Sequence, residues 1–317
     1  MIKRTLYFGN PYYLSKRLEQ LVIKDPNTAS ELRHIEHTVP IEDLGLVMLD
    51  HPQITVSQAL LESLLQHNVA VVSCDSRHHP AGMLLPLEGH HTQAVHIRHQ
   101  IAASEPLKKQ LWQQIVVAKI KNQAALLERM GKPFAPLLTY AKNVKSGDPD
   151  NYEARAAVHY WAHLFPSELD FRRDRDGLPP NHLLNYGYAI LRALVARAVV
   201  GAGLLPVLGI HHHNKYNAFA LADDLMEPYR PFVDAIVCQI VYGKKPYDTL
   251  SKDLKAQLMN IATIDVKYRG ERSPLLNSTH FLAAAVARCF GGDARKIALP
   301  EFPTKKSNDL ELQLPLT

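Results

Sequence analysis

The chain contains few cysteines and no long hydrophobic run, and each absence excludes a class of protein. The three cysteines lie far apart, at Cys74, Cys238 and Cys289, and no CxxC pair occurs, so a thiolate zinc site is not expected. We expect buried free thiols in a reducing compartment. The longest apolar run, 198–210, is interrupted by glycine and proline and is too short to span a bilayer. The N-terminal stretch has no signal-peptide pattern. These features predict a cytoplasmic protein with no membrane association.

Charge is modest overall but unevenly distributed. The formal net charge is +5, yet residues 95–145 contain nine Lys or Arg and only two Asp or Glu. Such an excess indicates contact with a phosphate backbone, or alternatively a solvated helix face.

The composition and the local patterns predict two domains of different type. With 317 residues, the chain exceeds the size of a typical single core. Residues 1–80 contain short apolar and β-branched runs, with one helix that Thr55 or Ser57 could cap. A stretch rich in Pro, Gly and His then predicts a linker at 81–92. The fold class we expect is α+β, with a small N-terminal β-domain and a larger all-α C-terminal domain at 93–298. The residues 299–317 are expected to form a peripheral tail.

Amphipathic periodicity predicts the helices of the second domain. The expected ranges are 94–130, 152–164, 181–204, 221–241, 247–260 and 278–290.

The residues 206–234 concentrate polar groups that could form a site. Three adjacent histidines, 211–213, precede a segment with Asp223, Asp224 and Glu227, and Arg230 follows. In a helix, the two aspartates lie within one turn of Glu227. A loop imidazole and helix carboxylates could therefore surround one cation, with the guanidinium available to a phosphate. The alternative is a polar loop followed by a solvated helix face.

Glu153 is a further candidate, and two roles are open for it. The pattern Asp150-x-x-Glu153 resembles a capping box, with Asp150 at the N-cap and Glu153 at N3. The functional alternative is a third metal ligand. One imidazole and two carboxylates with open positions suit Mg²⁺ or Mn²⁺. Such an ion, together with the basic residues, indicates phosphodiester chemistry.

Several motifs resemble one known family in order and spacing. They are NYEARAA (151–157), NHLLNYGYAIL (181–191), LGIHH (208–212) and DLMEPYRP (224–231). The chain is thereby similar to the CRISPR adaptation integrases, the first-numbered CRISPR-associated proteins. Two N-terminal stretches, IEDLGLVMLDHPQIT (41–55) and GMLLPL (82–87), resemble the type II form.

The resemblance implies a fold, a metal site and partners. It implies an N-terminal β-domain that forms a homodimer and a helical domain that binds one Mg²⁺ or Mn²⁺. The implied catalytic and metal-binding residues are Glu153, His212 and Glu227, although His211 or His213 could substitute for His212. The implied reaction inserts prespacer DNA into the CRISPR repeat through attack by a 3′-hydroxyl, with a small second adaptation protein as partner.

The remaining implied roles concern residues around the metal and along the DNA. Asp224, Arg230, Asn185 and Tyr186 are expected to support the site or contact DNA near it. The lysines expected to contact the DNA backbone are Lys108, Lys109, Lys119 and Lys121. Two alternatives remain open, namely a metal-dependent nuclease or phosphohydrolase acting on branched nucleic acid and a non-catalytic DNA-binding scaffold.

Overall fold

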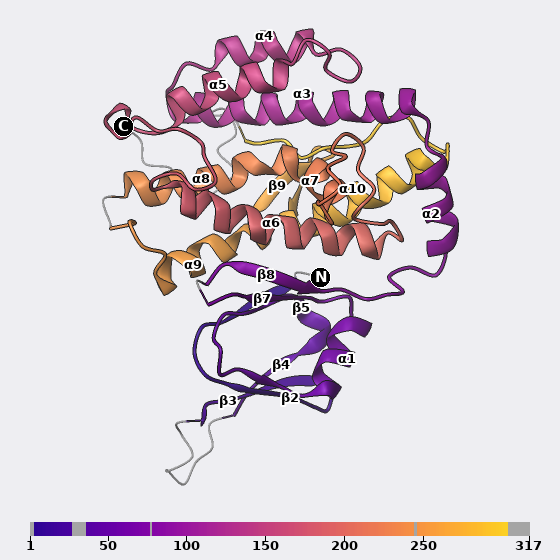
Figure 1. The fold of residues 1–317 in the computed structure, drawn as a ribbon, viewed down its shortest axis with the longest axis vertical. Helices are drawn as coiled ribbons and strands as arrows, with labels where there is room; N and C mark the ends of the chain where they lie inside the picture. Colours follow the sequence, from indigo (N-terminus) through magenta and orange to yellow (C-terminus); the bar gives the residue numbers. More distant parts are fainter. Residues whose placement is uncertain (1–2, 27–35, 77, 244–245, 304–317) are drawn as a thin grey trace. The chain divides into compact units, whose positions relative to one another are not determined.

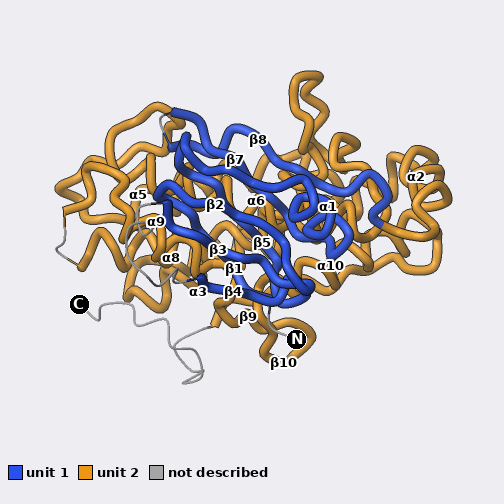
Figure 2. The backbone as a smooth tube through the Cα atoms, turned by 90° about the horizontal axis from the view of Figure 1, so that it is seen from below, with its two compact units in different colours: residues 1–89 blue, residues 90–317 orange. Residues whose placement is uncertain are grey.

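The computed structural model describes residues 3–26, 36–76, 78–243 and 246–303 and divides into two compact units. The units are Met1–Gly89 and His90–Thr317 (Figure 2). Strands dominate the first unit and helices the second (Figure 1). The expected α+β class is therefore confirmed.

The first unit contains two four-stranded sheets. One has the order β1-β5-β7-β8, in which the first three strands are parallel and β8 is antiparallel. Its strands are β1 (Arg4–Phe8), β5 (Leu44–Leu49), β7 (Ala70–Cys74) and β8 (Pro80–Leu84). The other has the order β4-β3-β2-β6. Its strands are β4 (Glu36–Pro40), β3 (Gln20–Lys24), β2 (Tyr13–Arg17) and β6 (Thr55–Val56).

Apolar residues from both sheets and from helix α1 (Gln58–Gln66) form one core in this unit. The expected helix start is settled in favour of Ser57, whose side chain accepts a hydrogen bond from the Leu60 amide. A short 3₁₀ helix, η2 (Ile41–Asp43), leads into β5, where nearly every residue is buried. Burial on both faces explains why β5 reads as a continuous apolar run.

The expected linker at 81–92 is partly wrong, because its first residues belong to a strand. β8 pairs with β7 from Cys74↔Pro80 to Val71↔Leu84. Its Pro, Ala and Gly residues do not show the alternation of a half-buried strand, since β8 lies at the sheet edge, where proline is tolerated.

The second unit contains the expected helices, with the predicted bounds at 152–164 and different bounds elsewhere, and also helices that were not expected, such as Ala135–Asn143. They are α2 (Gln93–Ala102), α3 (Glu105–Arg129), α4 (Ala135–Asn143), α5 (Tyr152–Leu164), η3 (Ser167–Leu169), α6 (Asn181–Gly201), α7 (Ala220–Met226), η4 (Glu227–Tyr229), α8 (Arg230–Tyr242), α9 (Lys252–Met259), η5 (Asn260–Ala262) and α10 (Leu275–Phe290). The expected helix 94–130 divides before Pro106, and the expected helix 221–241 is interrupted by η4 at Pro228. Both breaks lie beside a proline, which lacks the amide hydrogen that a continuous helix would need there.

Two helices form the centre of this unit. In Figure 1, α3 lies between the α4–α5 pair and the group that contains α6 and α8. α6 is long and apolar enough to cross a membrane by length and composition, and 78% of its most apolar window is buried inside the structure. Packing therefore accounts for its apolar character. Gly187 allows close contact with α8, since a Cβ there would lie 2.5 Å from Val233 Cγ1.

The expectation of an all-α second domain is corrected by a hairpin of β9 (Asp265–Tyr268) and β10 (Glu271–Pro274). Arg269 and Gly270 join the strands, both with positive φ. Two such residues are what a tight hairpin turn requires, and glycine adopts this conformation without strain.

The beginning of the expected tail packs on the second unit instead of forming a peripheral arm. Asn122 donates hydrogen bonds to the carbonyls of Pro228 and Pro300 and accepts one from the Phe302 amide. Phe302 is buried against Phe232. The rest of that expected tail, 304–317, lies outside the described residues.

Candidate active site

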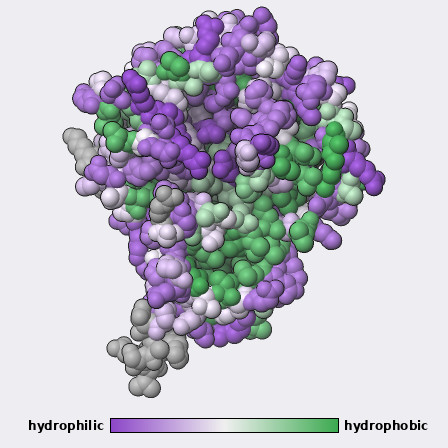
Figure 3. All heavy atoms as spheres, in the orientation of Figure 1, coloured by the Kyte–Doolittle hydropathy of each residue, from purple (hydrophilic) through white to green (hydrophobic). Residues whose placement is uncertain are grey.

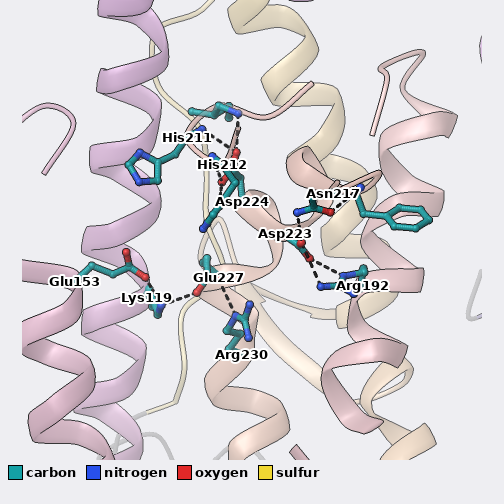
Figure 4. A network of polar contacts seen from close by, with 12 residues as sticks. Lys119, Glu153, Arg192, His211, His212, Asn217, Asp223, Asp224, Glu227 and Arg230 are labelled. Atoms are coloured by element: carbon teal, nitrogen blue, oxygen red, sulfur yellow. Dashed lines mark hydrogen bonds and ion pairs between the residues drawn. The ribbon is translucent and has the colours of Figure 1, made fainter. Parts of the chain in front are cut away.

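Asp224 organises the histidine loop. It is fully buried on α7 and accepts backbone N–H bonds from Ile210, His211 and His212 at 2.6, 2.9 and 3.3 Å. Its Oδ1 also lies 2.5 Å from His212 Nδ1. One carboxylate therefore fixes both the loop backbone and the imidazole (Figure 4). The expected role of Asp224, to support the site or to contact DNA near it, stays a prediction.

Gly209 permits this close approach of loop and helix. A Cβ at this position would lie 2.4 Å from the His212 carbonyl oxygen and 3.0 Å from Asp224 Oδ2. A side chain would therefore push the loop away from the carboxylate.

The three adjacent histidines occupy different environments. His211 stacks on Trp112 of α3 at 4.2 Å between ring centroids, and burial lowers its pKa. His213 is exposed. His212 has its pKa raised, chiefly by the hydrogen bond to Asp224. With Nδ1–H donated to Asp224, Nε2 of neutral His212 presents a lone pair, as metal-bound histidines do. This pattern favours His212 among the three as a ligand.

Glu227 is a buried carboxylate held by two cations. It begins η4, and its Oε1 accepts a hydrogen bond of 2.8 Å from Arg230 Nε. Lys119 Nζ lies 2.6 Å from Oε2. Burial alone would raise the pKa of Glu227, but the charges of Arg230 and Lys119 outweigh it and lower the pKa to about 2. Glu227 is therefore ionised at neutral pH.

The second oxygen of Glu227 lies against the Lys119 ammonium. Oε2 is buried, and Lys119 Nζ lies 2.6 Å from it. A buried, negatively charged oxygen is costly unless a cation lies beside it, and Lys119 supplies that charge here.

Glu153 is positioned by the start of α5. The expected capping box with Asp150 is wrong, because Asp148 accepts the amides of Tyr152 and Glu153, both at 2.9 Å. Asp150 instead forms an exposed ion pair with Lys145. Asp148 lies further back because Asn151 adopts a left-handed conformation that turns the chain into the helix. The Glu153 side chain takes no part in the helix cap. It accepts a hydrogen bond of 2.5 Å from Lys119.

The assignment of Lys119 to the DNA backbone does not match its position. Lys119 is buried on α3 and joins Glu153 to Glu227 (Figure 4). Burial alone would lower its pKa, but the charges of Glu227 and Glu153 raise it. The sequence places Lys119 among the basic residues of 95–145. Its periodicity does not reveal that α3 is packed on most of its faces.

Lys109 and Lys121 are exposed on the same helix, as a backbone contact requires. Lys108 is half-buried, pairs with Glu105 at 3.2 Å, and lines a cavity of about 340 Å³. Lys215 and His213 line the same cavity, which is thus basic.

Two further residues, Asp223 and Asn185, have polar partners of their own. Asp223 pairs with Arg192 and Asn217, apart from Glu227 (Figure 4). Asn185 bonds to Arg173 and to the Arg175 carbonyl, so it organises the loop before α6.

Tyr186 is fully buried in the helical core. Tyr186 is adjacent to Asn185 on α6, and adjacent residues of a helix point in different directions. The motif spacing alone did not show which of the two faces the core.

Sequence reasoning missed a buried network behind Arg230. The Arg230 guanidinium lies 4.6 Å from the centre of the Tyr188 ring. Tyr188 and Tyr160 donate hydrogen bonds of 2.5 and 2.8 Å to Asp234, which is buried on α8. Burial raises the pKa of Asp234 to about 6. Asp234 follows Arg230 by one helical turn, and this spacing was the available signal.

The donor set fits a divalent cation, although the carboxylates do not yet converge. Within the described part of the chain, no three His, Cys, Asp or Glu side chains are grouped closely enough to hold an ion. Lys119 lies between Glu153 and Glu227. The Nε2 lone pair of His212 and the carboxylate oxygens of Glu227 are nevertheless ligands that Mg²⁺ or Mn²⁺ accepts.

Comparison of the sequence finds one family. The family model described as CRISPR associated protein Cas1 matches residues 6–261. A CRISPR-associated endonuclease Cas1 of Neisseria meningitidis serogroup C is 34% identical over 98% of this chain and 100% of its own length. Another, from Pyrobaculum aerophilum, is 30% identical over 78% of this chain and 88% of its own.

Comparison of the structure finds related folds. A casposase bound to its integration product superposes with a TM-score of 0.76 at 20% identity, covering 100% of this chain and 96% of the other. A Cas1 protein from Thermotoga maritima gives 0.69 at 16% identity, covering 96% and 100%. A Cas6-RT-Cas1–Cas2 complex gives 0.71 at 20% identity, covering 93% of this chain and 35% of that one.

Proposed function

This chain belongs to the Cas1 family of CRISPR-associated proteins, and on that basis we propose that it is a metal-dependent integrase that inserts DNA into CRISPR arrays. Its relatives named as Cas1 endonucleases support a CRISPR-associated integrase or nuclease. The single observation that carries the metal-dependent form is that Glu227, a buried and ionised carboxylate, shares one cation, the Lys119 ammonium, with Glu153.

Glu153, His212 and Glu227 would hold the cation, and each is oriented by a different element. Glu153 starts α5 below the Asp148 cap, His212 lies in the loop that Asp224 holds, and Glu227 begins η4. Asp224 keeps Nδ1 of His212 protonated and its Nε2 lone pair available. Rigid supports of this kind limit the reorganisation needed at the site.

The proposed reaction is a transesterification. The 3′-hydroxyl of a prespacer attacks a repeat phosphorus, a new P–O bond forms, and the bond to the repeat strand's 3′-oxygen breaks. The leaving oxygen takes up a proton. A bound Mg²⁺ or Mn²⁺ would polarise the phosphoryl oxygen and stabilise the charge that develops. Arg230 carries a fixed positive charge beside Glu227 and would help to attract and orient a phosphate.

We include DNA and a small Cas2-like protein among the proposed partners. The support is a solved complex of related fold that contains both Cas1 and Cas2. The exposed Lys109 and Lys121 and the basic cavity beside His213 would contact the DNA backbone.

A homodimer formed through the first unit is also part of the proposal. β8 is an edge strand that ends in the exposed Leu84, and the exposed Leu87 follows it, at 38% and 93% exposure. Figure 3 shows hydrophobic residues gathered over the part of this unit that holds β8. Unpaired edges and apolar patches mark association surfaces. Light scattering of the purified protein should give twice the chain mass, and a monomer at micromolar concentration would refute this part.

The test of the function is a strand-transfer assay. The full chain and its small partner would be mixed with short duplex DNA and a repeat-containing plasmid, with Mn²⁺, Mg²⁺ or EDTA. Wild type should join the DNA only with metal, and Glu153→Ala, His212→Ala and Glu227→Ala should lose joining. Asp223→Ala is the matched control, because Asp223 faces Arg192 and should leave joining intact.

The second candidate is a nuclease in which water replaces the 3′-hydroxyl as nucleophile. The endonuclease names of the relatives favour it. Metal-dependent cutting without any joining, even of branched DNA, would select the nuclease. DNA binding without joining or cutting would show that the protein is a non-catalytic DNA-binding scaffold.

A further inference from the structure

The ammonium of Lys119 lies between two carboxylates that the proposed function assigns to the cation. Its Nζ is 2.5 Å from Glu153 Oε1 and 2.6 Å from Glu227 Oε2. Lys119 comes from α3, whereas the carboxylates come from α5 and η4, so this one side chain links three elements (Figure 4).

The negative charges of Glu153 and Glu227 need a cation beside them when no metal is bound. Arg230 neutralises the Oε1 side of Glu227, and Asp224 is already satisfied by the histidine loop. Glu153 and the Oε2 side of Glu227 therefore share the charge of Lys119. A buried carboxylate without a counter-charge would be strongly unfavourable, so the lysine stabilises the metal-free state.

We propose that Lys119 is an internal counter-ion that takes the place of the divalent cation in the metal-free protein and is displaced when the cation binds. This inference rests on the proposed function, since it takes Glu153 and Glu227 as ligands. An ammonium and a divalent cation cannot both lie against the same two oxygens, because their positive charges repel and they need the same space. Lys119 is thus a positioning residue: it keeps the two carboxylates charged and together, and it weakens metal binding by competing for them.

The test compares metal affinity in variants of the full chain. Lys119→Met removes the charge and keeps an unbranched side chain, and Lys119→Arg keeps the charge. Lys121→Met is the matched control on the exposed side of α3. Binding of Mn²⁺ alone would be measured by calorimetry. Thermal unfolding would be followed in EDTA and in excess Mn²⁺, without DNA or partner.

Lys119→Met should lower the Kd for Mn²⁺ by about tenfold or more, because no positive charge remains to be displaced. In EDTA this variant should melt below wild type, and Mn²⁺ should raise its Tm by more than it raises the wild-type Tm. Lys119→Arg and Lys121→Met should bind Mn²⁺ no more tightly than wild type.

Equal or weaker Mn²⁺ binding by Lys119→Met would overturn the inference, as would an equal gain in Lys119→Arg. Adding Glu227→Gln separates this failure from a wider one. If Glu227→Gln abolishes Mn²⁺ binding while Lys119→Met gains nothing, the inference alone fails. If Mn²⁺ binding is absent, or is unaffected by Glu227→Gln, the proposed function fails with it.

Discussion

Single buried acids determine what the neighbouring groups in this molecule can do. Asp224 accepts three backbone amides and one imidazole, so its two oxygens fix the shape of the histidine loop. Asp234 accepts two tyrosine hydroxyls in the core behind Arg230. The first acid serves the proposed metal site and the second serves packing.

Replacing Asp224 by Asn should weaken both folding and metal binding. An amide offers one acceptor oxygen where the loop and His212 require two, so unfolding should become easier by about 1–3 kcal/mol. Loss of the imidazole's partner should also reduce Mn²⁺ affinity by roughly 10–100-fold. Urea unfolding and calorimetry would measure the two effects. The neighbouring Asp223→Asn is the control and should keep wild-type Mn²⁺ affinity; equal losses in both variants would contradict the role given to Asp224.

Asp234 should make stability depend on pH. Its pKa is raised by burial from 3.8 to about 6 in the folded protein, so the folded state binds a proton more tightly than the unfolded state. The stabilisation is complete below the unfolded pKa and is lost as pH rises through about 6. Between pH 4 and pH 7, wild type should lose roughly 2–2.5 kcal/mol relative to Asp234→Asn. Chemical denaturation of both proteins across this range is the measurement, and parallel pH profiles would refute the assignment.

At the scale of elements, the positions that the sequence predicts best are those fixed by local chemistry. The Ser57 cap is one of the two that the sequence predicts. The breaks beside Pro106 and Pro228 lie inside the expected helices 94–130 and 221–241 and were missed, although each proline is a local signal. β8 was read as linker because an edge strand tolerates Pro and Gly. The hairpin β9–β10 was missed, although Arg269-Gly270 is a turn signal.

The candidate site also contains features that the sequence predicts and features that it could not predict. The resemblance predicts Glu153, His212 and Glu227 as ligands, and the structure places Lys119 between two of them, Glu153 and Glu227. The role of Lys119 could not be predicted, because it depends on how α3 packs against α5 and η4. The cap of α5 could not be predicted either, since it requires the left-handed Asn151.

The cap of α5 gives a prediction for the whole element. Asp148→Ala removes the acceptor of two helix amides and should cost about 0.5–2 kcal/mol of stability. It should also weaken Mn²⁺ binding, because the Glu153 amide loses its anchor. Asp150→Ala removes only an exposed ion pair and should change stability by about 0–1 kcal/mol. Thermal unfolding would rank the two variants, and a larger loss in Asp150→Ala would restore the capping box expected from the sequence.

At the scale of the whole molecule, the proposed DNA contacts depend on exposed charge. Lys109→Ala with Lys121→Ala should weaken duplex binding, and the slope of log affinity against log salt should fall by roughly 0.9 for each lost phosphate contact. Fluorescence anisotropy over a series of salt concentrations would measure this slope. The exposed Lys145→Ala, outside α3, is a control for net charge. An unchanged slope in the double variant would place the DNA on another surface.

The most direct test of the account is anomalous diffraction from crystals of the full chain soaked in Mn²⁺. The account predicts one strong peak within coordination distance of Glu153, His212 Nε2 and Glu227 Oε2, with the Lys119 ammonium moved out from between the two carboxylates. A Mn²⁺ peak elsewhere, or none, with Lys119 still bridging Glu153 and Glu227, would contradict it.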